Sequence, residues 1–191
     1  MMKQARVLND KQVKKLFNSP KMTKFESRNR LILTLSYYAG MRSCEICSLT
    51  VGDVIDGNGD IKESIQLKSH QTKGNMSQSV VLSSLVRGEI EKYVSEHSLT
   101  QKPLAAPLIK SQRGGFFSSQ SLQNLFKSLY KSVGFDDCSS HSGRRKFASS
   151  LDEKNVRVIQ LLLRHSHLST TSRYLSVSKH RLENSVNLLN Y

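Results

Sequence analysis

Two residues in the last third of the chain, His141 and Arg144, have types and a spacing that suit the binding of a phosphate group. Residues three apart on a helix share one face, so both side chains can address the same phosphate. A guanidinium offers planar, permanently charged donors that bind two oxygens at once. The alternative is that Arg144 belongs to a solvated basic run with Arg145 and Lys146, and the presence of His141 favours the phosphate site.

Two other basic residues, Arg42 and Lys73, each have two interpretations, one structural and one catalytic. Arg42 precedes Glu45 by three residues where a helix is expected to start, a spacing that favours an ion pair. Lys73 falls in the expected turn of a hairpin, where an exposed lysine is common, and Lys68 competes with it as a functional lysine. A lysine among arginines is a suitable acid for protonating a departing oxygen.

His165 and Tyr174 are nine residues apart. In one unbroken helix, nine steps of about 100° make about two and a half turns and place the two residues on opposite sides. The segment 169–171, Ser-Thr-Thr, predicts a break that would bring Tyr174 back toward His165. His165 also suits a buried histidine beside the apolar run 161–163, His167 is the competing functional histidine, and Tyr174 alone suits a surface tyrosine.

Taken in order, these residues lie in four motifs. The motifs are Gly40-Met-Arg42-Ser-Cys-Glu45-Ile, Thr72-Lys73-Gly74, His141-Ser-Gly-Arg144 and the segment 163–174, which reads LRHSHLSTTSRY. Their order and spacing resemble those of the tyrosine recombinases, or phage integrases, from Leu8 nearly to the end of the chain. The resemblance implies a tyrosine recombinase catalytic-domain fold of the DNA breaking-rejoining type, with an active site of Arg42, Lys73, His141, Arg144, His165 and Tyr174.

The resemblance also implies a site-specific DNA recombinase of the integrase or invertase type, which cleaves and rejoins DNA by transesterification. Tyr174 would attack the phosphorus and store the bond as a 3′-phosphotyrosine, so that religation needs no ATP. Arg42 and Arg144 would bind the non-bridging oxygens, Lys73 would protonate the departing 5′-oxygen, and Glu45 would orient Arg42. Neither a metal ion nor a cofactor is expected.

The sequence departs from the family pattern at Arg164, because a glycine usually stands immediately before the second histidine. A larger residue there keeps open a non-cleaving DNA-binding regulator on the same fold, and it could equally add a phosphate contact. A basic nucleic-acid-binding protein of the ribosomal type would explain the charge and none of the spacing. A relaxing activity like that of type IB topoisomerases is an enzymatic variant of the main interpretation.

The elements that must position these residues are mostly helices. Apolar periodicity and cap-type residues predict helices at about 11–17, 26–39, 41–49, 83–97, 119–133, 141–153, 156–163 and from about 178. Two alternating segments, 63–68 and 77–82, predict a hairpin, and turn residues cluster at 52–59. The helix at 26–39 is apolar almost all round, so we expect it at the centre of the core. The expected fold class is mainly α with a small antiparallel β-sheet (α+β).

Composition points to a polyanionic partner. The 191 residues include 29 Lys plus Arg against 15 Asp plus Glu, a net charge of +14, which favours double-stranded DNA as the partner. Apolar runs stay well below the roughly 20 residues that span a bilayer, so no membrane association is expected. The first residues lack the apolar core of a signal peptide, and we expect a cytoplasmic protein.

Three cysteines are too few for a disulfide framework. Cys44 and Cys47, with His165 and His167, superficially resemble a zinc ligand set. The expected helix at 41–49 favours a different interpretation, in which the two cysteines are small apolar residues of a helix.

The expected catalytic domain occupies 1–177 and is followed by a C-terminal helix at 178–191. Leu182, Val186 and Leu189 make one apolar stripe on that helix, and such a stripe must be buried. The family resemblance favours docking on a neighbouring protomer in a four-subunit synapse on DNA. Packing of the helix on its own domain is the alternative.

Overall fold

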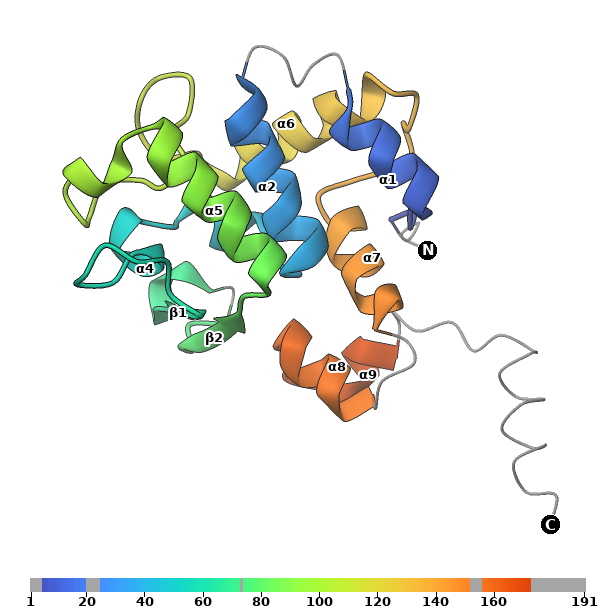
Figure 1. Ribbon diagram of the computed structural model, residues 1–191. Helices are drawn as coiled ribbons and strands as arrows, with labels where there is room; N and C mark the ends of the chain where they lie inside the picture. Colours follow the sequence, from blue (N-terminus) through green and yellow to red (C-terminus); the bar gives the residue numbers. More distant parts are fainter. Residues whose placement is uncertain (1–4, 20–24, 73, 152–155, 173–191) are drawn as a thin grey trace, which may run out of the picture. The chain divides into compact units, whose positions relative to one another are not determined.

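The computed structural model describes residues 5–19, 25–72, 74–151 and 156–172. Internal contacts divide the chain into two compact units, Met1–Phe147 and Ala148–Tyr191. The first unit holds α1 (Asp10–Phe17), α2 (Glu26–Tyr38), α3 (Ser43–Cys47), α4 (Val51–Val54), β1 (Ser64–Leu67), η2 (Ser69–Gln71), β2 (Gln78–Val81), α5 (Ser84–Glu96), η3 (Leu99–Gln101) and α6 (Ser119–Lys131) (Figure 1). Helix α7 (Ser142–Ser150) runs across the boundary, and α8 (Val156–Leu163) and α9 (Leu168–Ser172) lie in the second unit. The structure therefore has the predicted class, mainly α with one small antiparallel sheet.

Helix α1 begins where the cap-type residues predict. Asn9 Oδ1 accepts a hydrogen bond from the Gln12 N–H at 2.9 Å, and Gln12 Oε1 accepts one from the Asn9 N–H at 3.1 Å. This reciprocal pair is a capping box, which satisfies N–H groups that the first helical turn would otherwise leave without partners. An ion pair of 2.7 Å between Asp10 and Lys146 then links the start of α1 to α7.

Helix α2 is the centre of the core, as its apolar sequence predicts. Its residues from Leu31 through Tyr37 are all buried, and it contacts α3 and α5. Figure 1 shows α5 lying alongside α2. Helix α2 is followed by Gly40, whose φ of +59° is a left-handed backbone conformation that glycine adopts without steric cost. The chain can therefore turn sharply at the point where Arg42 follows.

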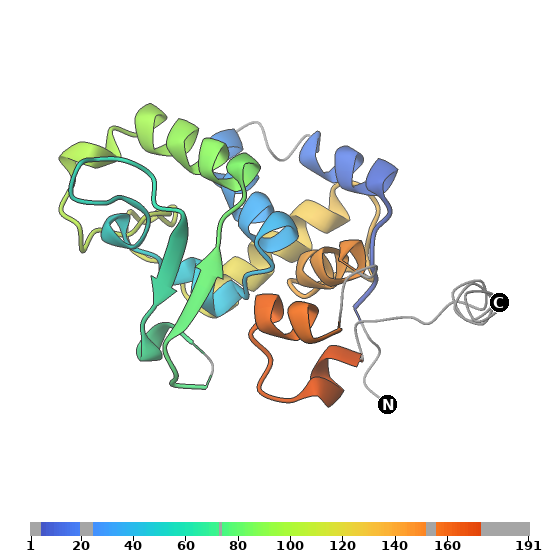
Figure 2. The same cartoon turned by 60° about the horizontal axis from the view of Figure 1, so that its bottom comes forward.

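The predicted hairpin is present. Strands β1 and β2 pair antiparallel (Figure 2). Ile65 stands opposite Val80, and both side chains are buried. Each strand is shorter than its predicted segment, 63–68 or 77–82. The turn residues predicted at 52–59 are correct only in part, because residues 51–54 form α4, where Asp53 Oδ2 accepts a hydrogen bond from the Thr50 N–H at 2.9 Å.

Helix α7 approaches α2 very closely at Gly143. A Cβ atom placed on Gly143 would stand 2.3 Å from Ser36 Oγ and 2.7 Å from the ring of Tyr37. Beneath this contact, the hydroxyl groups of Tyr37 and Tyr130 are hydrogen-bonded at 3.0 Å, and burial raises the pKa of both phenols. Glycine is required here because the two helices leave no room for a side chain.

The second unit corrects one prediction. The break expected at Ser169–Thr171 is wrong, since these residues belong to α9, and the chain instead turns between α8 and α9 at residues 164–167. The His165 N–H donates to the Gln160 carbonyl at 3.1 Å, and the Arg164 N–H donates to the Leu161 carbonyl at 3.0 Å. This pattern is a Schellman motif, with Arg164 at the left-handed position (φ +54°) that glycine usually fills. The motif explains why glycine is usual before the histidine, and it shows that arginine adopts the same backbone.

The other predicted helices are confirmed with small shifts of their ends. Helix α7 ends at Ser150, which is earlier than the predicted 153, whereas α8 has the predicted bounds of 156–163. The predicted C-terminal helix at 178–191 and the predicted domain boundary at 177 lie outside the described residues. Both stay predictions.

The close packing at Gly143 is testable by its effect on stability. Gly143→Ala should lower the free energy of unfolding by about 1 to 3 kcal/mol, because the added methyl group overpacks the contact between α7 and α2. Gly88→Ala is the matched control, since Gly88 also lies in a helix and nothing stands within 4 Å of its added Cβ. The control should gain about 0.5 to 1 kcal/mol. Urea unfolding followed by circular dichroism measures both changes, and equal effects at the two sites would contradict the packing argument.

Candidate active site

Arg42 is held by a buried carboxylate. Its Nη1 lies 2.6 Å from Glu45 Oε1, and its backbone N–H donates to Glu45 Oε2 at 2.8 Å. The Glu45 side chain is fully buried, whereas 20% of the Arg42 side chain is exposed. A short ion pair of this kind fixes the guanidinium in place while leaving part of it open to a ligand. The predicted pairing of Arg42 with Glu45 is therefore present.

Arg144 is anchored at the same turn. It is 1% exposed, and its Nη1 donates a hydrogen bond to the Gly40 carbonyl oxygen, two residues before Arg42. The two arginines are distant in sequence, yet both are tied to the turn between α2 and α3. Two guanidinium groups at one turn create a strong local attraction for an anion such as a phosphate.

His141 lies immediately before α7, one helical turn from Arg144. Its carbonyl oxygen accepts a hydrogen bond from the Arg145 N–H at 2.9 Å, so the first turn of α7 starts at this residue. The Ser139 N–H donates to Ser142 Oγ at 3.1 Å, and the His141 N–H donates to Ser139 Oγ at 3.3 Å, which fixes the backbone here. His141 is exposed, whereas Arg144 is buried.

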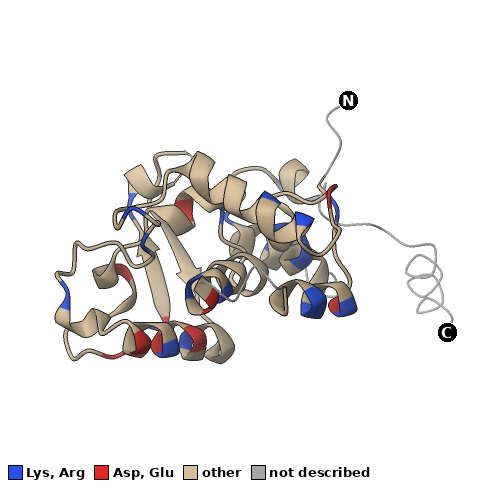
Figure 3. Ribbon diagram, turned by 90° about the horizontal axis from the view of Figure 1, so that it is seen from above, with Lys and Arg blue, Asp and Glu red and all other residues tan. Residues whose placement is uncertain are grey.

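The basic character is uneven among the helices. Helix α7 carries three basic residues and no acidic one, whereas α5 carries three glutamates among its charged residues. Figure 3 shows this mixture of red and blue along α5. The charge of α7 is therefore positive, whereas that of α5 is mixed.

In the second unit, His165 is placed by the turn between α8 and α9. Its side chain is 8% exposed, and Nδ1 lies 3.0 Å from Thr171 Oγ1. The Gln160 amide donates to the His165 carbonyl at 3.0 Å. Thr171 fixes the imidazole ring, and sequence reasoning missed this role, although Thr171 lies within the quoted motif. His167, the competing histidine, is exposed.

The predicted lysine and nucleophile, Lys73 and Tyr174, lie outside the described residues. The loop on either side of Lys73 is nevertheless held at defined points. The buried Gln71 amide donates to Asp53 Oδ2 at 2.8 Å, and Thr72 Oγ1 donates to the Met76 carbonyl at 2.8 Å. The competing residue, Lys68, is exposed. The structure thus brings Arg42, His141 and Arg144 into the first unit and His165 into the second.

The two helical cysteines have the chemistry of structural residues. Burial raises the pKa of Cys44 and raises that of Cys47 to about 11, and Cys47 Sγ donates a hydrogen bond to the Cys44 carbonyl at 3.2 Å. A zinc ligand must instead be a thiolate. Across the described parts of the chain, no group of three or more His, Cys, Asp or Glu residues is arranged to hold a metal ion.

The same described parts contain no helix with the length and apolar character that crossing a bilayer requires.

Comparison with known proteins identifies relatives of the chain. It is 28% identical over 183 residues to tyrosine recombinase XerD of Halalkalibacterium halodurans, an alignment that covers 93% of this chain and 59% of the relative. It is 31% identical over 179 residues to tyrosine recombinase XerC of Thermodesulfovibrio yellowstonii, covering 88% of this chain and 57% of the relative. The chain therefore spans somewhat more than half the length of these relatives.

The fold also matches a solved structure. The Tn1549 transposon integrase, solved in complex with transposon right end DNA, superposes with a TM-score of 0.73 at 16% identity, over 98% of this chain and 67% of that one. The sequence model described as the phage integrase family matches residues 6–181. Because this match includes nearly all of the chain, the protein belongs to the phage integrase family.

Proposed function

We propose that this chain is the catalytic part of a site-specific DNA recombinase, which cleaves and rejoins DNA through a covalent bond to Tyr174. The observation that carries the proposal is the pair of arginines at one turn, Arg42 held by buried Glu45 and Arg144 held by the Gly40 carbonyl. The names of the relatives and the DNA-bound integrase of the same fold support it. We assign the catalytic domain to residues 1–177.

In this mechanism the Tyr174 hydroxyl loses its proton to water as its oxygen attacks the phosphorus of one phosphodiester. The bond to the 5′-oxygen breaks, Lys73 supplies the proton that this oxygen takes up, and a 3′-phosphotyrosine forms. Arg42 and Arg144 bind the non-bridging oxygens, whose negative charge increases in the pentavalent transition state. His141 and His165 donate further hydrogen bonds to the phosphate. Attack of a 5′-hydroxyl on the phosphotyrosine reverses the step and restores the DNA.

The partner of the whole protein is double-stranded DNA, in keeping with the net charge of +14. We further propose that protomers assemble into a tetrameric synapse on DNA, in which the helix at 178–191 docks on a neighbouring protomer. We also propose a cytoplasmic location, in keeping with DNA as the substrate.

A regulator that binds DNA without cutting it is the weaker alternative. Arg164 was the residue that favoured it, because a side chain there was expected to disturb the backbone near His165. The structure gives Arg164 the left-handed conformation of the glycine it replaces, and the helix end keeps its hydrogen bonds. The departure at Arg164 therefore supplies no argument against cleavage.

The nucleophile can be tested by covalent capture. Tyr174→Phe should abolish the covalent adduct on a nicked suicide substrate and leave DNA affinity close to that of the parent, because only the attacking hydroxyl is lost. Denaturing gels measure the adduct, and gel shifts measure the affinity. An adduct formed by the Phe variant would place the nucleophile elsewhere.

The arginine pair can be tested by single-turnover cleavage at saturating protein. Arg42→Ala and Arg144→Lys should each slow cleavage by about 10²- to 10³-fold, because a donor to the charged transition state is lost or misplaced. Arg113→Ala removes an exposed arginine in the segment before α6, distant in sequence from Arg42 and Arg144. This variant should cleave DNA at the parental rate. Variants at Arg42 and Arg144 that match this control would contradict the proposed phosphate site.

The proposed mechanism of DNA cleavage needs no metal ion. Cleavage should persist in excess chelator, because arginine and lysine cations supply the positive charge that metal ions supply in other nucleases. The measurement is the yield of covalent adduct with and without chelator. Loss of the adduct, with recovery on adding zinc or magnesium, would overturn this assignment.

A further inference from the structure

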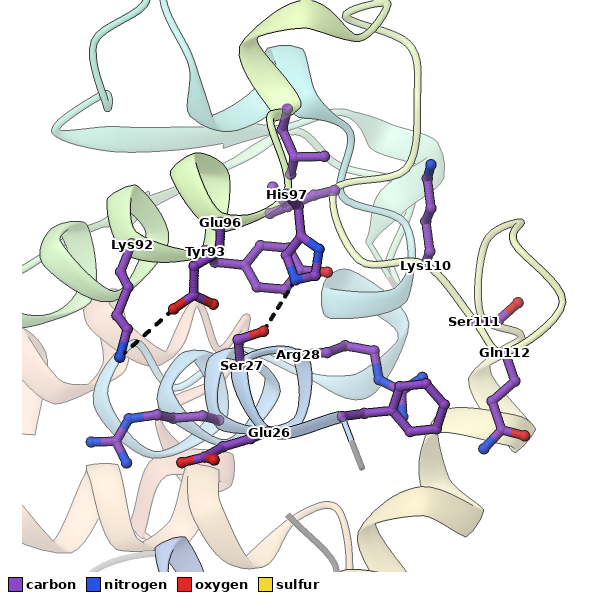
Figure 4. Close-up of a pocket in the computed structure, with 14 residues that line it drawn as sticks. Glu26, Ser27, Arg28, Lys92, Tyr93, Glu96, His97, Lys110, Ser111 and Gln112 are labelled. Carbon is purple, nitrogen blue, oxygen red and sulfur yellow. Dashed lines mark hydrogen bonds and ion pairs between the residues drawn. The ribbon is translucent and has the colours of Figure 1, made fainter. Parts of the chain in front are cut away.

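A cavity lies at the opposite end of α2 from the arginine pair. Its volume is about 560 Å³, and its walls come from the first turn of α2, the end of α5 and the segment that precedes α6 (Figure 4). Helix α2 has 13 residues at about 1.5 Å each, so the cavity is separated from Arg42 by roughly 20 Å. A cavity of this size accommodates a small organic molecule.

One wall of the cavity contains a buried positive charge. Arg28 is 6% exposed, and its Nε and Nη2 donate to the neutral Asn29 Oδ1 at 3.2 and 2.9 Å. Its guanidinium lies 4.1 Å from the ring centroid of Phe25 and 5.3 Å from that of Phe117. Burial lowers the pKa of Arg28. Among the described residues, no carboxylate lies within ion-pair distance of the Arg28 guanidinium. Its described partners are two aromatic rings and one neutral amide.

The carboxylates near the cavity do not neutralise Arg28. Glu96 is exposed and lies 3.9 Å from Lys92, and Glu89 pairs with Arg30 at 3.2 Å. Glu26 also lines the cavity, and it is exposed. A buried charge without a counterion is costly, and a ligand that supplies the counterion recovers much of this cost.

Other groups in the cavity suit a phosphate. The α2 N-cap residue is Phe25, which has no side-chain oxygen to accept from the first-turn N–H groups, and the positive end of the helix dipole is at this wall. Ser27 Oγ lies 3.1 Å from His97 Nε2, and Figure 4 shows the two side chains pointing toward each other across the cavity. The ring of Tyr93 packs against that of His97, with centroids 4.3 Å apart, and this part of the wall also includes the almost fully buried Leu99 and Leu108.

We propose that this cavity binds a small molecule that carries one phosphomonoester group, with the phosphate on Arg28 and the first turn of α2 and an apolar body against the exposed ring of His97. The Arg28 guanidinium, the Ser27 hydroxyl and the N–H groups of the first turn of α2 are all donors, and a phosphomonoester has three terminal oxygens to accept from them, against two in a carboxylate. Duplex DNA is a poor occupant, because its phosphates are held on a rigid backbone and Arg28 lies in a recess. The site is separate from the recombination chemistry and needs neither Tyr174 nor DNA.

The test is calorimetric titration of the full chain with phenyl phosphate at constant ionic strength. Phenyl phosphate should bind with a stoichiometry of one, at least tenfold more tightly than inorganic phosphate, benzoate or phenol. Arg28→Gln should weaken this binding at least tenfold. Lys131→Gln removes one positive charge from the exposed last turn of α6, which does not line the cavity, and should bind as the parent does.

A second variant covers the case in which Arg28→Gln fails to fold. His97 is exposed at the cavity wall, so His97→Ala should leave the fold intact, remove the partner of Ser27 and weaken phenyl phosphate binding several-fold. Equal binding of benzoate would overturn the phosphomonoester assignment. Binding that is unchanged in both variants, or an Arg28→Gln variant that loses affinity for duplex DNA and not for phenyl phosphate, would overturn the cavity site itself. None of these outcomes bears on covalent capture by Tyr174.

Discussion

The hydrogen bond from the Arg144 guanidinium to the Gly40 carbonyl joins two segments that are 104 residues apart in sequence. It forms only if α7 lies against α2, and the absence of a side chain at Gly143 allows that approach. The accepting carbonyl belongs to Gly40, which adopts a left-handed backbone conformation just after α2 ends. The packing of α7 on α2 therefore anchors Arg144 at the turn that Arg42 follows.

Burial makes this arrangement rigid. Glu45 is fully buried. Its carboxylate is tolerated there because the guanidinium and the backbone N–H of Arg42 both bind it. Removing either partner would leave an uncompensated charge in the core, so the pair has little freedom to rearrange. A phosphate-binding group that is fixed before the ligand arrives needs no reorganisation during the reaction, which is the basis of electrostatic catalysis.

Arg28 presents the opposite case at the other end of the same helix. There a guanidinium is buried against aromatic rings and an amide, and no carboxylate pairs with it among the described residues. Positive charge thus lies near both ends of one central helix, with different partners at each end. At the α2–α3 turn the protein supplies the counterion for Arg42 itself, whereas the cavity beside Arg28 leaves that place to a ligand.

Much of the fold was predictable from local sequence. The Asn9 cap of α1, the apolar length of α2 and the alternating strands of the hairpin each follow from patterns within a dozen residues, and so does the class of the fold. The motifs around Arg42, His141, Arg144 and His165 likewise identified the family. Local patterns did not predict helix α4, and they placed the break after α8 at the wrong residues. The chain turns at a Schellman motif, which needs a left-handed backbone at Arg164. The Ser-Thr-Thr run at 169–171, from which the break was predicted, does not indicate that conformation. The tertiary structure alone decided that Arg144 is anchored at Gly40 and that Arg28 is buried beside a cavity, because both depend on contacts between helices that are distant in sequence.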